Sequence, residues 1–121
     1  MLQAVEMVTE LLNQEVEKLD GKSENVFIGG FSQGCALSLA TFMKYPHRLG
    51  AVIGLSGMLA LDLQKEQIDM ELKKKTPMFL YHGDRDQMID IQAAQMSYSL
   101  LDKHGLNYSL TVEKGLEHSI S

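Results

Sequence analysis

A serine stands between two glycines in the segment GFSQG, residues 30–34, where an apolar run gives way to a helical pattern. The spacing G-x-S-x-G is that of a nucleophile elbow, a sharp strand-to-helix turn that presents a serine hydroxyl. Glycine is expected at Gly30 and Gly34 because a Cβ at these flanking positions would collide within such a turn. The backbone N–H of Gln33, at the start of the helix, is placed to stabilise an oxyanion. Ser32 is therefore the candidate nucleophile.

A serine nucleophile needs a base, and the base needs an acid that orients it. Asp86 ends the segment HGDRD, residues 82–86, which follows a later apolar run. His118 ends the segment GLEH, residues 115–118, which follows the last apolar run. The order serine, aspartate, histidine, each after a strand, is that of the α/β-hydrolase triad. We therefore expect Ser32, Asp86 and His118 to act together.

Nearby residues of the same types compete for two of these roles. Asp84 is an alternative to Asp86, since either aspartate could instead bond to the backbone of its loop. His82 is an alternative to His118, although its place beside the acid favours a role in fixing the turn. The remaining candidates are expected to be structural: Ser56 in a turn, His47 and His104 at the surface, and Cys35 in the core. The histidine spacing favours no metal site.

Short apolar runs alternate with helical patterns along the chain. The pattern predicts helices over residues 2–19, from Gln33 until Pro46, and over 90–103; strands over 26–29, 51–55, 77–81 and 108–112; and a helical or partly irregular connection over 62–75. Such an order predicts a single α/β domain over 1–121, with a mainly parallel four-stranded sheet and helices on its faces. Ligands gather at the carboxyl ends of parallel strands, where each candidate residue lies.

Composition narrows the classes of function. The net charge of −5 provides no electrostatic basis for binding nucleic acid, and no apolar stretch is long enough for a transmembrane segment. The cationic run 73–75 is expected to be a solvated helix end. A single cysteine excludes an intramolecular disulfide and is compatible with a reducing compartment, so we predict a cytoplasmic protein.

The segments GGFSQG (29–34), HGDRD (82–86) and GLEH (115–118) together resemble the phospholipase/carboxylesterase family of α/β-hydrolases, which includes acyl-protein thioesterases and small carboxylesterases. The resemblance implies hydrolysis of carboxylic esters or acyl thioesters through an acyl-enzyme, without metal or organic cofactor. It assigns the nucleophile to Ser32, the acid to Asp86 and the base to His118. It also implies a small acyl substrate, which could be part of a lipid or a lipidated protein.

The resemblance covers the C-terminal portion of the family's fold. Family members have strands before the position of the first helix, and a loop among them supplies a second oxyanion donor. The sequence therefore predicts a partial α/β-hydrolase that lacks the usual N-terminal strands. An alternative reading is a catalytically weak or inactive fragment with a binding or structural role. The uncovered edge of the first strand also motivates the hypothesis of a homodimer that covers it.

Overall fold

A computed structural model describes residues 2–61, 63 and 68–118. In chain order the elements are α1 (Leu2–Lys18), the short 3-10 helix η1 (Ser23–Asn25), β1 (Phe27–Phe31), α2 (Gln33–Lys44), β2 (Ala51–Leu55), α3 (Met70–Lys73), β3 (Met78–Gly83), α4 (Ile91–Lys103) and β4 (Tyr108–Glu113). The four strands form one sheet in the order β1-β2-β3-β4, and every neighbouring pair is parallel. The predicted parallel sheet flanked by helices is confirmed.

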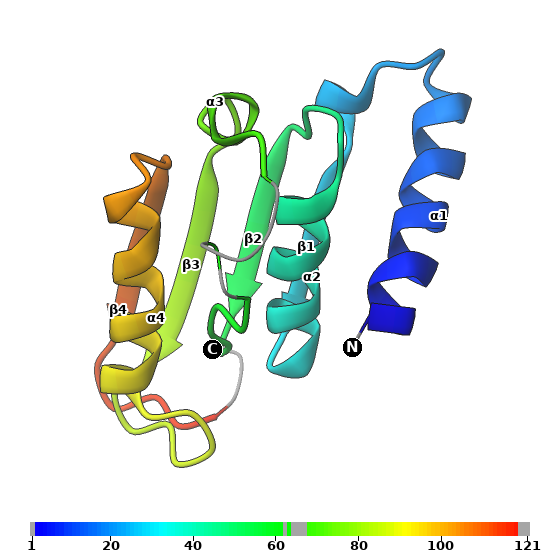
Figure 1. Ribbon diagram of the computed structural model, residues 1–121. Coiled ribbons are helices and arrows are strands. Elements are labelled where there is room, and N and C mark those ends of the chain that lie inside the picture. Colours follow the sequence, from blue (N-terminus) through cyan, green and yellow to red (C-terminus); the bar gives the residue numbers. More distant parts are fainter. Residues whose placement is uncertain (1, 62, 64–67, 119–121) are drawn as a thin grey trace.

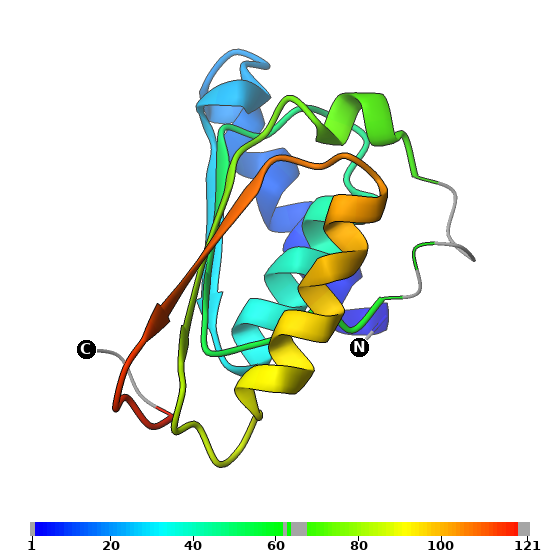
Figure 2. The ribbon, with the colours of Figure 1, turned by 90° about the vertical axis from the view of Figure 1, so that its left-hand side faces the viewer.

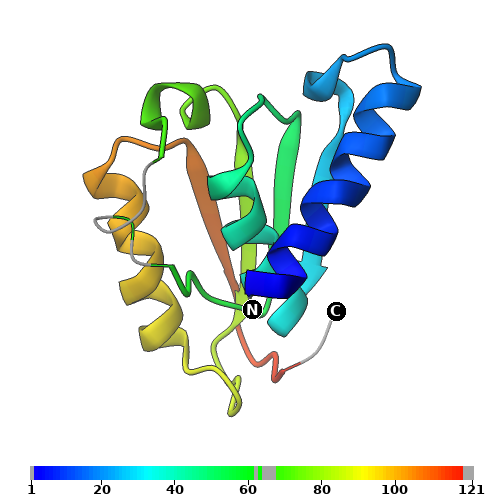
Figure 3. The same ribbon diagram turned by 45° about the vertical axis from the view of Figure 1, so that its right-hand side comes forward.

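The helices lie on one face of the sheet, as Figure 2 shows edge-on. Helices α2 and α4 lie along the strands, and α1 packs beside α2 (Figure 3). Alternate residues of the strands point into this layer, because successive side chains of a strand point to opposite faces. The core between the sheet and the helices includes Ile28, Val52, Met78, Leu80, Leu39, Phe42 and Leu101.

The opposite face of the sheet exposes large apolar side chains. Phe27 of β1 is 67% exposed, and Ile53, Phe79 and Tyr81 are also exposed on neighbouring strands. The expectation that helices cover both faces is therefore wrong for the described residues. Continuous apolar runs are typical of strands buried on both faces, but the described helices bury only one of them. The strand order leaves β1 at an edge of the sheet, as expected.

Strands β1 and β3 extend further toward their carboxyl ends than the sequence predicts. The predicted strands stop at residues 29 and 81, whereas β1 ends at Phe31 and β3 at Gly83. The residues beyond these points include Gly30 and Gly83, and glycine favours strands weakly. Parallel pairing with neighbouring strands extends the ladders: Phe31 pairs with Leu55, and Gly83 with Glu113. Both strands therefore run to the edge where the candidate residues lie (Figure 1).

Lys73 departs from the expected solvated helix end. It is 2% exposed, and its Nζ donates hydrogen bonds of 2.5 Å to the backbone carbonyls of Phe42 and Tyr45. The ammonium also lies 4.7 Å from the centroid of the Phe42 ring. Burial lowers the pKa of Lys73 to about 8. The prediction is wrong for this lysine, which caps the C-terminus of α2, whereas Lys74 forms a surface ion pair with Glu71.

Candidate active site

Ser32 occupies a strained turn between β1 and α2. Its φ of 58° and ψ of −117° lie in a region that non-glycine residues rarely adopt. The turn is held by a hydrogen bond from the Ser32 N–H to the Leu55 carbonyl at 2.8 Å. On its other side, the Ser32 carbonyl accepts the N–H groups of Cys35 and Ala36 at 3.0 and 3.2 Å, which starts α2. The local geometry is that of the predicted elbow.

The two flanking glycines have different reasons to be glycine. A Cβ on Gly30 would overlap the carbonyl group of Gly34 and lie 2.9 Å from the backbone nitrogen of Cys35. A Cβ on Gly34 would have no heavy atom within 4 Å. The expected collision therefore occurs at Gly30, and the expectation is wrong for Gly34, whose Cβ position faces open space. Gln33 is the first residue of α2, so its N–H has no partner within the helix.

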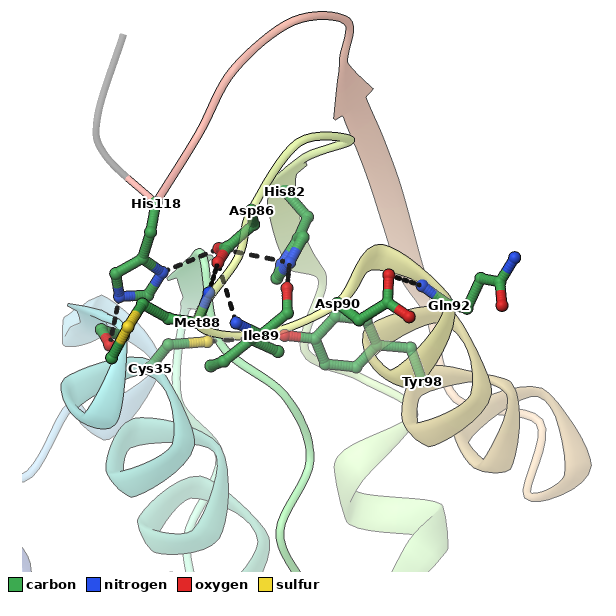
Figure 4. A network of polar contacts seen from close by, with 10 residues as sticks. Cys35, His82, Asp86, Met88, Ile89, Asp90, Gln92, Tyr98 and His118 are labelled. Carbon is green, nitrogen blue, oxygen red and sulfur yellow. Dashed lines mark hydrogen bonds and ion pairs between the residues drawn. The ribbon is translucent and has the colours of Figure 1, made fainter.

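A continuous hydrogen-bonded chain joins Ser32, His118 and Asp86. His118 Nε2 lies 2.7 Å from Ser32 Oγ. On the other side of the ring, His118 Nδ1 lies 2.7 Å from Asp86 Oδ2 (Figure 4). Because a carboxylate only accepts, the neutral imidazole donates from Nδ1, and Nε2 is left to accept the serine proton. The three residues come from the ends of β1, β3 and β4. In this arrangement a histidine can remove a proton from a serine hydroxyl.

The loop after β3 holds Asp86 rigidly. Its Oδ1 accepts the backbone N–H groups of Met88 at 2.9 Å and Ile89 at 2.8 Å, while Oδ2 faces His118. Burial tends to raise the pKa of Asp86, but these N–H groups and His118 outweigh burial, so its pKa is held below its ordinary value. Asp86 is therefore a carboxylate at neutral pH, with a fixed orientation toward the imidazole.

The structure separates the competing residues. Asp84 is exposed, and its Oδ1 accepts the N–H of Gly115 at 2.7 Å. His82 is buried beside Asp86, with Nε2 2.7 Å from the Ile89 carbonyl oxygen and 3.4 Å from Asp86 Oδ2. Its Nδ1 is buried without a hydrogen-bond partner among the described residues. Asp86 and not Asp84 contacts the histidine, and His82 lies on the other side of Asp86 (Figure 4).

Sequence reasoning missed the contact between Phe31 and His118. The two rings lie 5.0 Å apart between centroids, at 39° to one another. Phe31 thus packs beside the imidazole, at the same point of the chain from which Ser32 projects. The variable position of the elbow motif carries no signal for such a contact. The backbone donors Met88 and Ile89 were also missed, although an aspartate that bonds N–H groups two and three residues ahead is a common turn.

The remaining candidates take structural positions. Ser56 is buried and has a φ of 54°, in the loop after β2. Cys35 is fully buried, with Sγ 3.5 Å from the hydroxyl oxygen of Tyr98, and burial raises the pKa of its thiol. His47 is exposed, and His104 is the C-terminal cap of α4. These positions agree with the turn, core and surface roles expected of them.

An open pocket of about 210 Å³ adjoins His118, and its lining also includes Gln87, Met88 and Glu117. Met88 is 76% exposed and brings an apolar side chain to the pocket.

The described residues include no group of three or more histidine, cysteine, aspartate and glutamate side chains placed to hold a metal ion. No helix in the described part of the chain has the length and apolar character needed to cross a membrane.

Comparison with known proteins places this site in a family context. A family model described as Phospholipase/Carboxylesterase matches residues 1–121. The chain is 36% identical over 116 residues to "Acyl-protein thioesterase 1 homolog 1" of Dictyostelium discoideum, covering 95% of this chain and 50% of that protein. It is 37% identical over 121 residues to "Carboxylesterase SOBER1" of Arabidopsis thaliana, covering 100% of this chain and 53% of that one.

One of the same relatives also matches among solved structures. The crystal structure of Arabidopsis thaliana SOBER1 matches with a TM-score of 0.90 and 38% sequence identity, over 99% of this chain and 57% of that chain. The chain spans about half the length of the curated relatives that it matches. Because the family model matches this chain from residue 1 to residue 121, the chain belongs to the phospholipase/carboxylesterase family.

Proposed function

We propose that the protein is a serine hydrolase that cleaves carboxylic esters or acyl thioesters through an acyl-enzyme. The observation that carries this function is the chain of two 2.7 Å contacts from Ser32 through His118 to Asp86. Both distances lie within the range for hydrogen bonds that transfer or orient a proton. The strained backbone of Ser32 supports it further, because a nucleophile elbow requires that geometry.

The proposed reaction uses two proton transfers in each half. His118 Nε2 takes the proton of Ser32 as Oγ attacks the substrate carbonyl, and the Gln33 N–H binds the resulting oxyanion. Asp86 stabilises the imidazolium through its Nδ1–H. The imidazolium then protonates the departing alcohol or thiol, which leaves the acyl group on Ser32. Water, deprotonated by His118, attacks this acyl-enzyme, and His118 returns the proton to Ser32 as the acid departs. These steps need no cofactor.

The pocket beside His118 supports an acyl substrate with an apolar part. Met88 lines this pocket together with His118 and offers a flexible apolar side chain there. The relatives' names, acyl-protein thioesterase and carboxylesterase, support an ester or thioester as the reacting group. We extend this to lipids or lipidated proteins as substrates. A cytoplasmic location and a homodimer that covers the edge of β1 stay predictions.

Covalent labelling with a fluorophosphonate tests this function. The wild-type protein should be labelled at Ser32 and should hydrolyse p-nitrophenyl butyrate, and an acyl thioester of the same chain length should also be tested. Ser32→Ala should abolish labelling, and His118→Ala should slow it strongly because the serine then lacks its base. Absence of labelling, together with ester hydrolysis no faster than that of Ser32→Ala, would refute the proposed function.

A weakly active hydrolase is the second candidate, because the described residues provide one oxyanion donor, the Gln33 N–H. Loss of one donor typically lowers kcat by about a hundredfold to a thousandfold. Such a protein would still be labelled at Ser32, but slowly. Its ester turnover would be measurable above Ser32→Ala only at high protein concentration. The labelling rate and the ester turnover, each compared with Ser32→Ala, therefore separate the two candidates.

A further inference from the structure

Hydrogen bonds join the loop after β3 to the end of β4 and to the loop that follows β4. Two of these bonds are between backbone groups, and one uses a side chain. They are Asp84 N–H to the Glu113 carbonyl at 3.1 Å, Arg85 N–H to the Leu116 carbonyl at 3.1 Å, and Gly115 N–H to Asp84 Oδ1 at 2.7 Å. Only the last depends on the identity of a side chain, because any non-proline residue provides a backbone donor.

The bond from Gly115 to Asp84 lies three residues before His118. Gly115 has a φ of +81°, a conformation that glycine adopts without strain and that turns the chain after β4. We propose that Asp84 is a positioning residue, whose carboxylate holds the turn at Gly115 and so places His118 between Ser32 and Asp86. This inference rests on the proposed function above.

The position of His118 explains why a hydrogen bond that fixes this turn matters. His118 lies beyond the end of β4, an edge strand, on a segment that is largely exposed. A hydrogen bond to a carboxylate is roughly twice as strong as one between neutral groups. A displacement of about 1 Å at a catalytic group can lower the rate on the order of a hundredfold. A bond that fixes this exposed turn therefore has a large effect on the imidazole and a small one on the core.

The close packing of the two loops transmits the position of the turn. A Cβ on Gly83 would overlap the Leu116 carbonyl group, so no side chain separates the loops at this point. Within the β3 loop the two aspartates face in different directions: Asp86 is buried toward the imidazole, and Asp84 is exposed toward the β4 loop. The two aspartates therefore have different positioning roles. Asp86 orients the histidine ring directly, and Asp84 orients the loop that carries it.

Paired substitutions at Asp84 test this role. Asp84→Ala removes the acceptor and should lower kcat about tenfold or more with KM unchanged within about twofold, because the imidazole acts in the transition state and not in substrate binding. Asp84→Asn keeps an oxygen at the same position and should retain kcat within about threefold. Asp69→Ala is the matched control. Asp69 also accepts an exposed backbone N–H, that of Leu72 at 3.1 Å, at the start of α3, and its loss should leave kcat unchanged.

Amide hydrogen exchange at Gly115, followed by NMR, provides a readout that does not need activity. Asp84→Ala should accelerate this exchange, with the melting temperature close to that of the wild type, and Asp84→Asn should not. An unchanged kcat in Asp84→Ala, an equal loss in Asp84→Asn, or a loss expressed only in KM would each overturn the inference. If the wild type hydrolyses no ester, the proposed function fails, and the positioning role of Asp84 is then tested by Gly115 exchange alone. Unchanged exchange in Asp84→Ala would overturn that role, and accelerated exchange would support it.

Discussion

Replacing Asp86 by asparagine should separate the proposed catalytic role of this residue from its role in the loop. The Asp86 Oδ1 accepts the N–H groups of Met88 and Ile89, and an asparagine oxygen at the same position would preserve both bonds. The amide NH2 would then occupy the position of Oδ2, 2.7 Å from His118 Nδ1. Since the NH2 group only donates, Nδ1 of His118 must become the acceptor.

This exchange inverts the tautomer of His118. Its proton moves to Nε2, which then donates to Ser32 Oγ and has no lone pair to accept the serine proton. The same substitution in a serine protease lowers kcat by about 10⁴ while the geometry stays intact, and we expect a loss of that order here. Asp86→Ala would remove the loop bonds as well, leaving two backbone N–H groups unpaired at about 1–3 kcal/mol each.

Measurements of activity and of stability separate these variants. Fluorophosphonate labelling rates and p-nitrophenyl ester turnover should fall by about 10⁴ in Asp86→Asn, while calorimetry shows a smaller loss of melting temperature than in Asp86→Ala. Asp86→Ala should lose both activity and several degrees of melting temperature. An Asp86→Asn variant that retains activity within about tenfold of the wild type would refute the reasoning, because the contact with Nδ1 would then not set the tautomer.

The pH dependence of stability gives an independent check on Asp86. Because its folded-state pKa is held below the unfolded value of about 3.9, the folded state binds fewer protons than the unfolded state in this range. Asp86 therefore contributes stability above that value, and the contribution disappears as the pH falls through the folded-state pKa. Urea unfolding at about pH 6 and about pH 3 should show a smaller loss of stability in Asp86→Asn than in the wild type.

Three further outcomes follow from particular contacts. Gly30→Ala should abolish fluorophosphonate labelling, because the new Cβ overlaps the Gly34 carbonyl, whereas Gly34→Ala should remain labelled; equal labelling of both would contradict the geometry. Lys73, whose pKa burial lowers to about 8, binds fewer protons when folded, so urea unfolding should show stability rising between about pH 8 and about pH 10.5 in the wild type relative to Lys73→Met. Cys35, fully buried with a raised thiol pKa, should react with iodoacetamide at about pH 8 only after unfolding; rapid reaction of the folded protein would contradict its core position.

Local sequence patterns predicted most of the elements that position the site. The helix predicted over 90–103 and the strand over 51–55 agree with α4 and β2 to within a residue, because apolar spacing and terminal signals act over a few neighbours. The carboxyl ends of β1 and β3 were missed in part because they include Gly30 and Gly83, and glycine favours strands weakly. Those ends form only because neighbouring strands provide the hydrogen-bonding partners.

The sequence predicted which kinds of residue form the site, but it predicted only in part which of them contact one another. The elbow motif is local, so the sequence alone pointed to Ser32. The chain order left Asp84 and Asp86 both open, and the family resemblance assigned the acid to Asp86. The decision came from a loop that turns one aspartate inward to the imidazole and the other outward to Gly115. The conformation of the whole loop decides which of the two aspartates faces the imidazole, and no local pattern predicts that conformation.

The sequence by itself determined the alternating order of strands and helices and the turn at Ser32, because each follows from residues close together in the chain. It also determined the family, because each of the three segments that carry the resemblance is a local motif. Tertiary structure alone decided that Lys73 is buried and that helices cover one face of the described sheet. It also decided that His118 Nε2 lies 2.7 Å from Ser32 Oγ, across a separation of 86 residues. Such contacts join segments that share no local pattern, so only the packing of the whole sheet brings them together.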